Sequence, residues 1–334
     1  MTRDKVLTFR ARQLPQDIDE AEAIQLLLQA FRPKQAVAVR IGSLVYSLAT
    51  CDETRFKTAT FTVVPLPACP KDQREKHFFV ERNGVDCDFI IDKHFLDFTV
   101  LNQAHDDDHL LDCIAISGLV SHPFGSWKQR GDGDCFMWLR DGLPKTLNGV
   151  RTILYGYKSH MVLSHSFQNS TGIAMKLVNR LTVMGFGSAH SKPLIFIDHS
   201  LGGIVLKAGM VVLIGYSDRQ PSIIGCIKSV ICFGLPHKGM TTPQLITMVK
   251  GQPSEKLVQT LCVDPEYLQH IDMCSAASRS SATLRWCHFL RRRPQKPWLK
   301  APAESGAGAG QTWSWYIATR PFTNAHCPWM ISIA

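Results

Sequence analysis

The stretch PLIFIDHSLGGIVLKAGMVVL, residues 193–213, decides the fold of the central part of this chain. The apolar run Leu194–Ile197 ends abruptly at Asp198, His199 and Ser200, and a second apolar run with helical spacing follows. This pattern predicts a buried strand, a tight turn and a helix. A serine at such a turn is a candidate nucleophile, because the turn lifts its hydroxyl to the edge of the sheet.

The residues around Ser200 fit the spacing that this turn requires. The start of the helix passes close to the end of the strand, so small residues are needed two positions before and two positions after the serine. Gly202 and Gly203 follow it, whereas Asp198 stands where such turns usually carry glycine. The backbone N–H of Leu201 would point at a developing oxyanion, assisted by the helix N-terminus. Ser200 is therefore the nucleophile that we expect, and Asp198 is a departure.

The same alternation extends over residues 109–274. Continuous apolar strands separated by helices predict a mostly parallel sheet covered on both faces, an α/β sandwich of three layers. The strands that we expect are LDCIAIS (111–117), VRTILYGY (150–157), PLIFID (193–198) and IKSVICFGLP (227–236). The helices are expected at 137–147, 166–184 and 201–216.

The N-terminal residues 1–64 predict a separate small α+β module of ferredoxin-like type. Strand and helix signals follow the order β-α-β-β, with a helix begun by Asp17 or Asp19. RNA-recognition modules share this order, but RFKTATFTV offers only the aromatic residues Phe56 and Phe61, so the RNP1 pattern is absent. A structural or docking role is favoured over nucleic-acid binding.

Residues 65–108 predict a loosely structured connection. His105 and His109 flank three aspartates and could hold a metal ion, but nothing nearby completes a ligand set. A solvated charge run is the favoured interpretation. We expect neither a metal nor a cofactor.

The basic charge of the chain is concentrated at its C-terminal end. Residues 275–334 hold eight Lys or Arg and one acidic residue, Glu304, and so carry +7 of the net charge of +9. This segment combines RRRPQKP with the low-complexity APAESGAGAG, and it is predicted to be disordered. A shifted reading frame or a misplaced splice boundary would also produce such a tail, in which case the end of the preceding domain is missing.

The N-terminal sequence MTRDKV has no apolar segment typical of a secretory signal. Eleven cysteines occur without a C-x-x-C pair, as in a protein of a reducing compartment. No apolar run is long enough to span a bilayer. We expect an intracellular, cytoplasmic protein, and the sequence leaves peripheral membrane contact and organelle association open.

Four stretches together resemble a known family. FIDHSLGGIVLK (196–207), IAISGLVSHPFGSWK (114–128), MWLRDGLPKTL (137–147) with ILYGY (153–157), and VICFGLPHKGM (230–240) look like fungal lipase-like α/β hydrolases. These include serine-active-site-containing lipase-like proteins and the hydrolase heads of fungal ankyrin or NTPase receptors. The resemblance covers about residues 112–272. It implies a Ser–Asp–His hydrolase that acts on a small-molecule ester or acyl-lipid substrate.

This chain differs from the usual sequence of the family at two places. The family usually reads His-Gly at the oxyanion loop, where this chain has Ser117, Gly118 and Leu119. The backbone N–H near Leu119 can still serve, beside that of Leu201, because a main-chain donor depends on the shape of the loop. Asp198 replaces the small residue of the turn, and its charge, if ionised, would disfavour an oxyanion nearby.

The sequence does not decide which residues are the acid and the base of a catalytic triad. In this fold the acid and the histidine follow the serine in the chain, so the candidates are Asp218 or Asp264 as acid and His270, His288 or His326 as base. We expect packing or pocket-rim roles for the other histidines of this region, His122, His165, His199 and His237. Two hypotheses follow: an active serine hydrolase, and a catalytically inactive hydrolase fold that serves as an interaction or sensor protein with a protein partner.

Overall fold

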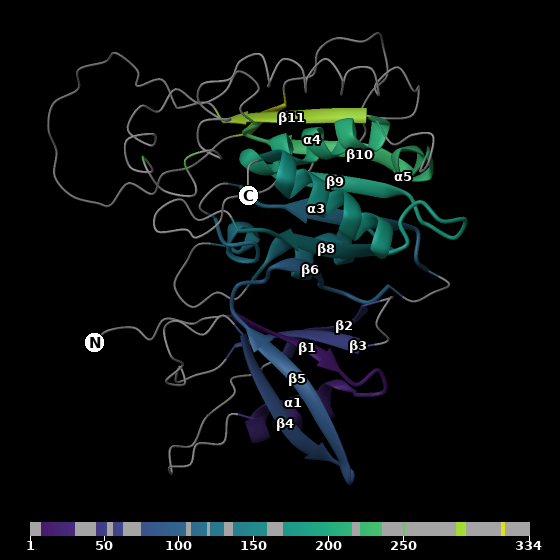
Figure 1. The fold of residues 1–334 in the computed structure, drawn as a ribbon. Helices are drawn as coiled ribbons and strands as arrows, with labels where there is room; N and C mark the ends of the chain where they lie inside the picture. The colour runs from purple at the N-terminus through teal and green to yellow at the C-terminus, as the bar shows by residue number, and fades with distance from the viewer. Residues whose placement is uncertain are drawn as a thin grey trace, which may run out of the picture.

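Two β-sheets form the framework of this computed structural model (Figure 1). The structure describes residues 8–30, 45–51, 56–62, 75–104, 108–118, 121–129, 136–158, 170–215, 221–235, 250, 255, 285–291 and 315–317. The first sheet has five strands and the second has seven. The chain completes the first sheet before it enters the second.

The five-stranded sheet is antiparallel, with the order β2-β3-β1-β5-β4. Its elements are β1 (Thr8–Leu14), α1 (Glu20–Ala30), β2 (Val45–Cys51), β3 (Phe56–Thr62), β4 (Glu75–Arg82) and β5 (Val85–Asp92). The β-α-β-β order predicted for residues 1–64 is present, but two further strands complete the sheet. The sheet therefore differs from the predicted ferredoxin-like module.

The helix α1 begins at a reciprocal cap. The backbone N–H of Glu22 donates to Oδ1 of Asp19 at 2.8 Å, and the backbone N–H of Asp19 donates to Oε2 of Glu22 at 3.2 Å. This capping box selects Asp19 over Asp17 as the start of the helix. Leu26 and Leu27 of α1 are buried in one hydrophobic cluster with β-strand residues such as Phe61.

The predicted loosely structured connection over 65–108 contains three strands instead. β4 and β5 form a hairpin whose turn residues Asn83 and Gly84 both have positive φ, 52° and 80°. Asn-Gly is the dipeptide that two-residue hairpin turns favour, because both positions lie in the left-handed region. β6 (Asp97–Val100) follows and joins the second sheet.

The seven-stranded sheet is mixed, with the order β12-β11-β10-β9-β7-β8-β6. Five neighbouring strands are parallel, and β6 and β12 are antiparallel to them at the two edges. The strands besides β6 are β7 (Leu111–Ile116), β8 (Val150–Gly156), β9 (Leu194–His199), β10 (Ile227–Phe233), β11 (Arg285–Arg291) and β12 (Trp315–Ile317). The carboxyl ends of the parallel strands therefore meet at one edge of the sheet.

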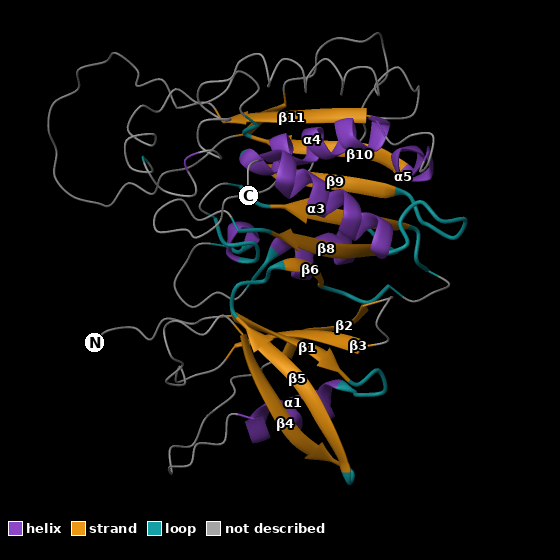
Figure 2. Cartoon of the chain, in the orientation of Figure 1, coloured by secondary structure: helices purple, strands orange, loops and turns teal. Residues whose placement is uncertain are grey.

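Each face of this sheet has its own hydrophobic cluster. Alternate strand residues such as Ile116 and Phe196 pack against the helices α3 (Ser170–Val183), α4 (Leu201–Gly215) and α5 (Pro221–Cys226) (Figure 2). The residues between them, such as Ala115 and Ile197, share a second cluster with aromatic residues of the segment 123–147. This alternation is the period of two that a sheet covered on both faces requires.

The segment predicted as one helix over 137–147 is divided. It forms a π-helical turn, η2 (Trp138–Gly142), followed by a short α-helix, α2 (Leu143–Thr146). A 3₁₀ turn, η1 (Gly125–Trp127), precedes them. Pro144 lies in the first turn of α2, where its missing N–H costs no helical hydrogen bond.

The predicted disordered tail contributes to the sheet. β11 pairs in parallel with β10, in the register Val230↔Trp286 to Phe233↔Phe289, and β12 pairs antiparallel with β11. The sheet therefore extends beyond residue 274, where we expected the domain to stop. The prediction of disorder is wrong for these two strands, and the rest of residues 275–334 lies outside the described residues.

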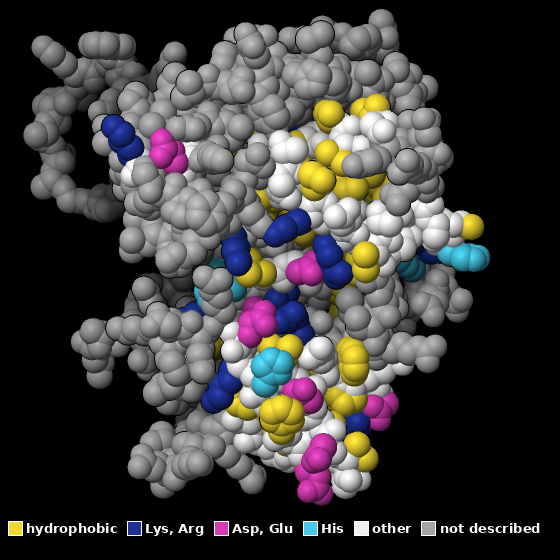
Figure 3. Space-filling view, viewed as in Figure 1, with side chains coloured by type: hydrophobic (Ala, Val, Ile, Leu, Met, Phe, Trp, Pro, Cys, Tyr) yellow, Lys and Arg dark blue, Asp and Glu magenta, His cyan; other side chains and the backbone are white. Residues whose placement is uncertain are grey.

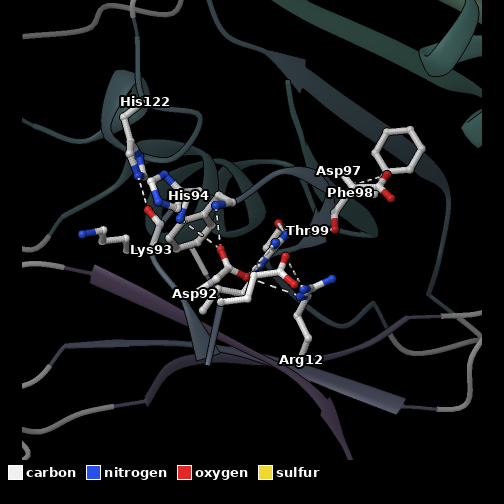
Figure 4. Close-up of polar contacts among 11 residues, drawn as sticks. Arg12, Asp92, Lys93, His94, Asp97, Phe98, Thr99 and His122 are labelled. Carbon is white, nitrogen blue, oxygen red and sulfur yellow. Dashed lines mark hydrogen bonds and ion pairs between the residues drawn. The ribbon is translucent and has the colours of Figure 1, made fainter. Parts of the chain in front are cut away.

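A buried polar cluster around Asp92 of β5 and Thr99 of β6 links the two sheets (Figure 4). Arg10 of β1 is 1% exposed and donates through Nε to Oδ2 of Asp92 at 2.9 Å. Its Nη1 donates to Oγ1 of Thr99 in β6 at 2.6 Å. Burial lowers the pKa of Arg10, and the Asp92 carboxylate opposes that shift. The guanidinium therefore ties a strand of the first sheet to an edge strand of the second.

Candidate active site

Ser200 occupies the sharp junction between β9 and α4. Its φ is 54°, in the left-handed region that residues other than glycine rarely adopt. The backbone N–H of Ser200 donates to the carbonyl of Phe233 at 2.9 Å, and its own carbonyl accepts from the N–H of Gly203 at 3.2 Å. The strand ladder thus runs up to Ser200 and the helix begins directly after it. The side chain is half-buried at the carboxyl edge of the parallel strands.

Two glycines make this junction possible. A β-carbon at Gly202 would collide with the carbonyl oxygens of Ile116 and Ser117 at the end of β7. A β-carbon at Gly203 would collide with Oδ1 of Asp198 and lie 2.7 Å from Leu235. Because backbone atoms cannot yield as a flexible side chain can, α4 starts against the sheet only with glycine at position 202.

The loop after β7 lies against Ser200. A β-carbon at Gly118 would be 3.0 Å from Cβ of Ser200 and 2.8 Å from Nδ1 of His199. The carbonyl of Ser117 accepts a hydrogen bond from Oη of Tyr157 at 2.8 Å, and the carbonyl of Gly118 accepts one from Oγ of Ser121 at 2.7 Å. Gly118, at the start of the loop predicted to hold an oxyanion, therefore lies beside the serine, and Leu119 lies outside the described residues.

Asp198 lies in the interior, on the face of the sheet covered by α4. It is 0% exposed, and its Oδ2 accepts a hydrogen bond from Sγ of Cys232 at 3.0 Å. Within the described part of the chain its Oδ1 has no hydrogen-bond partner. Burial raises the pKa of Asp198 to about 7, while the Cys232 hydrogen bond and the charge of Lys207 oppose the shift. The carboxyl therefore exchanges a proton near neutral pH.

The structure does not assemble a triad among the residues that it describes. Asp218, Asp264, His270 and His326 lie outside the described residues, as do His165 and His237. The backbone of His288 belongs to β11 and pairs with Cys232 of β10, but its side chain is not described. The acid and the base therefore remain predictions.

Two histidines near the site have structural contacts. Nε2 of His122 donates to the carbonyl of Lys93 at 2.6 Å, and its Nδ1 accepts from the backbone N–H of Gly125 at 3.0 Å. The ring of His199 lies beside Gly118. The packing or pocket-rim roles that we expected for these two histidines stay predictions.

The acidic run near residue 108 leads into a buried charge cluster. Nε2 of His109 lies 2.9 Å from Oδ1 of Asp112, and Arg151 donates to both oxygens of that carboxylate, at 2.6 and 3.1 Å. His105 lies outside the described residues. Over the residues that can be searched, no group of three potential ligands could hold a metal ion. No helix among them is long and apolar enough to cross a membrane.

Two residues of this region were not anticipated. Cys232 of β10 donates to Asp198, which lies 34 residues earlier in the chain. Tyr157, directly after β8, donates to the carbonyl of Ser117, which lies 40 residues earlier. Both belong to apolar strand patterns that indicate only burial. No local signal in the sequence marks either contact.

Comparisons with known proteins give distant structural similarity only. No protein-family model matches the chain, and no curated protein matches it. A lipase of Bacillus licheniformis, BlEst2 in its mature form, is similar over 57% of this chain and 69% of its own, with 15% identity and a TM-score of 0.35. Phospholipase PlaB of Legionella pneumophila is similar over 49% of this chain and 33% of its own, with 15% identity and a TM-score of 0.34. A cutinase-like protein of Cryptococcus sp. is similar over 42% and 60%, with 19% identity and a TM-score of 0.26.

Proposed function

We propose that this chain is a lipase- or esterase-like serine hydrolase with an α/β-hydrolase fold and that Ser200 is its nucleophile. The observation that carries the proposal is the positive φ of Ser200, 54°, at the junction of a buried parallel strand with a helix. A non-glycine residue in this region is strained, and such strain concentrates at functional sites. The same turn exposes the nucleophile of α/β hydrolases.

The surroundings of Ser200 offer main-chain hydrogen-bond donors for an oxyanion. The first amides of α4 have no partner within the helix, so the N–H of Leu201 is available beside the serine. Gly118 lies directly against Ser200 and leads to Leu119, whose N–H we assign as the second donor. An oxyanion formed at this place would be stabilised by two main-chain dipoles and the helix N-terminus.

The reaction follows from these groups. Oγ of Ser200 attacks the carbonyl carbon of an ester while a base takes its proton, and the base returns the proton to the departing alcohol. Water then hydrolyses the acyl-enzyme in the same manner. The acid would come from Asp218 or Asp264, and the base from His270, His288 or His326. Without a base, the serine hydroxyl is a poor nucleophile at neutral pH.

A second candidate function rests on Asp198. Its buried carboxyl lies under the turn that carries Ser200, and an ionised carboxyl at this place opposes a negative charge on the substrate. A protein with this feature could keep the fold and serve as an interaction or sensor protein without ester turnover.

Hydrolysis of a p-nitrophenyl ester by the full chain distinguishes the two candidates. The proposal expects turnover that Ser200→Ala abolishes and that Ser126→Ala leaves intact. Ser126 is a matched control, because it is an exposed serine whose Oγ donates only to the carbonyl of His122, at 2.8 Å, among described contacts. Folded protein without turnover would favour the inactive candidate. Turnover that survives Ser200→Ala would reject Ser200 as the nucleophile.

A further inference from the structure

A cavity of about 280 Å³ opens near the carboxyl end of β8, between β6, β8 and α3. Its volume lies close to the lower end of the range for small-molecule pockets, about 300–1,000 Å³. Figure 3 shows Lys and Arg side chains gathered over this part of the molecule, with hydrophobic side chains beside them. The cavity is lined from three separate elements, so it is formed by the fold and not by one flexible loop.

The floor of the cavity is apolar and aromatic. Ile173 of α3 and the rings of Tyr155 and Tyr157 line it, and all three side chains are buried. The two rings are stacked, with centroids 6.2 Å apart and an angle of 27° between their planes. Such a surface favours a flat or apolar group on the ligand.

The rim of the cavity is cationic. Lys158, Lys176 and Arg180 line it, and Asp97 is the one carboxylate among the residues that do so. Nε of Arg180 donates to Oδ1 of Asp97 at 2.8 Å, which fixes the guanidinium at the mouth. Neither Lys158 nor Lys176 has an ion pair within the described part of the chain. Three cations against one carboxylate leave an excess of positive charge for an anionic ligand.

We propose that this cavity binds a phosphate monoester that carries a small apolar or aromatic group. At pH 8 a phosphate monoester has close to two negative charges, which match the two unpaired lysines. The apolar part of the molecule would lie on the floor formed by Tyr155, Tyr157 and Ile173. An anion without an apolar group would use only the rim, and an apolar molecule without charge would use only the floor.

The site is distinct from Ser200 but connected to it. Tyr157, which lines the cavity, donates to the carbonyl of Ser117 at 2.8 Å, and the next residue, Gly118, lies against Ser200. β8 and β9 are separated by β7, so these two strands lie about 10 Å apart in the sheet. The calorimetric test measures ligand binding and not ester hydrolysis. Failure of the proposed esterase activity would therefore not contradict this proposal.

Calorimetric titration of the full chain at pH 8 with three probes tests the proposal. Phenyl phosphate should bind more tightly than inorganic phosphate and more tightly than phenol. The double variant Lys158→Gln/Lys176→Gln should weaken phenyl phosphate binding roughly tenfold. Lys145→Gln should leave it unchanged, because Lys145 is an exposed lysine of α2 away from the cavity.

Three results would overturn the proposal. Phenol binding as tightly as phenyl phosphate would remove the role of the cationic rim. Inorganic phosphate binding as tightly as phenyl phosphate would remove the role of the aromatic floor. Equal weakening by Lys145→Gln and by the double variant would show that overall charge, and not this cavity, attracts the anion. A circular dichroism spectrum of each variant establishes that the comparison is between folded proteins.

Discussion

Sγ of Cys232 donates a hydrogen bond to Oδ2 of Asp198 at 3.0 Å, in the interior and below the turn that carries Ser200. The two side chains come from neighbouring parallel strands, where Cys232 is paired with Asp198 in the register of β9 and β10. Among the described residues, the thiol is the one hydrogen-bond donor to this carboxyl group. This pair allows an aspartate to replace the small residue expected at the turn.

Replacing Asp198 by asparagine should change how stability depends on pH. The pKa of Asp198 is about 7 in the folded chain, above its usual 3.8, so the folded state holds the proton longer than the unfolded state. Stability contributed by the protonated carboxyl is therefore complete below about pH 4 and is lost as the pH rises to about 7. At about 1.4 kcal/mol for each pKa unit, the loss is about 4 kcal/mol.

Urea unfolding of the wild type and of Asp198→Asn between pH 4 and 8 measures this effect. The stability of Asp198→Asn relative to the wild type should rise across this interval and become constant above it. Cys232→Ala removes a hydrogen bond that favours the ionised form, so it should enlarge the loss in the wild-type background. A pH-independent difference between wild type and Asp198→Asn would contradict the buried, proton-exchanging carboxyl.

Glycine at position 200 should be at least as stable as alanine there. Any residue with a β-carbon is strained at the φ of 54° that Ser200 adopts, whereas glycine is not, and this relief is about 1 kcal/mol. In an ordinary helix interior the order is reversed, and glycine is less stable than alanine by about the same amount. The pair Met175→Ala and Met175→Gly, at an exposed position of α3, provides that reference. If both positions prefer alanine equally, the turn is not strained.

Gly202→Ala should be strongly destabilising, whereas Gly215→Ala should not be. A β-carbon at position 202 meets the backbone at the end of β7, but no atom of the described residues lies within 4 Å of one at position 215. Both glycines belong to α4, so the helical preference for alanine applies to both. Thermal melting of the two variants gives the comparison. We expect Gly202→Ala to lose several degrees or to fail to fold, and Gly215→Ala to melt at or above the wild-type temperature.

The Arg10–Asp92 pair should contribute far more to stability than the neighbouring Arg12–Glu75 pair. Arg10→Leu leaves the Asp92 carboxylate buried with its main partner removed, which costs about 3–5 kcal/mol. The Arg12–Glu75 ion pair is exposed, 29% and 46% for the two side chains, so Glu75→Gln should cost less than 1 kcal/mol. The midpoints of urea unfolding measure the stability cost of both substitutions. Similar costs for the two variants would mean that the buried Arg10–Asp92 pair of the first sheet contributes no more to stability than an exposed ion pair.

The sequence predicted the centre of the molecule well because its signals there are local. The apolar run of β9, the small residues after Ser200 and the apolar helix α4 follow one another directly, and each depends on its own neighbours. The hairpin of β4 and β5 carries an equally local signal in Asn83 and Gly84. It was missed because β4 is an edge strand with Phe78 and Val80 only partly buried, so its apolar alternation is weak.

The parts that sequence could not predict depend on distant contacts. β11 begins and ends with arginine, and it forms a strand because it pairs with β10. Its Trp286 pairs with Val230, 56 residues earlier in the chain. The same holds for the candidate site. The position of Ser200 is a local property, but Cys232 beside Asp198 and Tyr157 beside Ser117 come from distant parts of the chain.

Labelling of the folded chain by a fluorophosphonate probe, with the modified residue located by mass spectrometry, tests the central claim most directly. The account predicts a single adduct on Ser200 that disappears in Ser200→Ala and persists in Ser126→Ala. Folded protein that remains unlabelled at Ser200, or that is labelled equally well in Ser200→Ala, would contradict it.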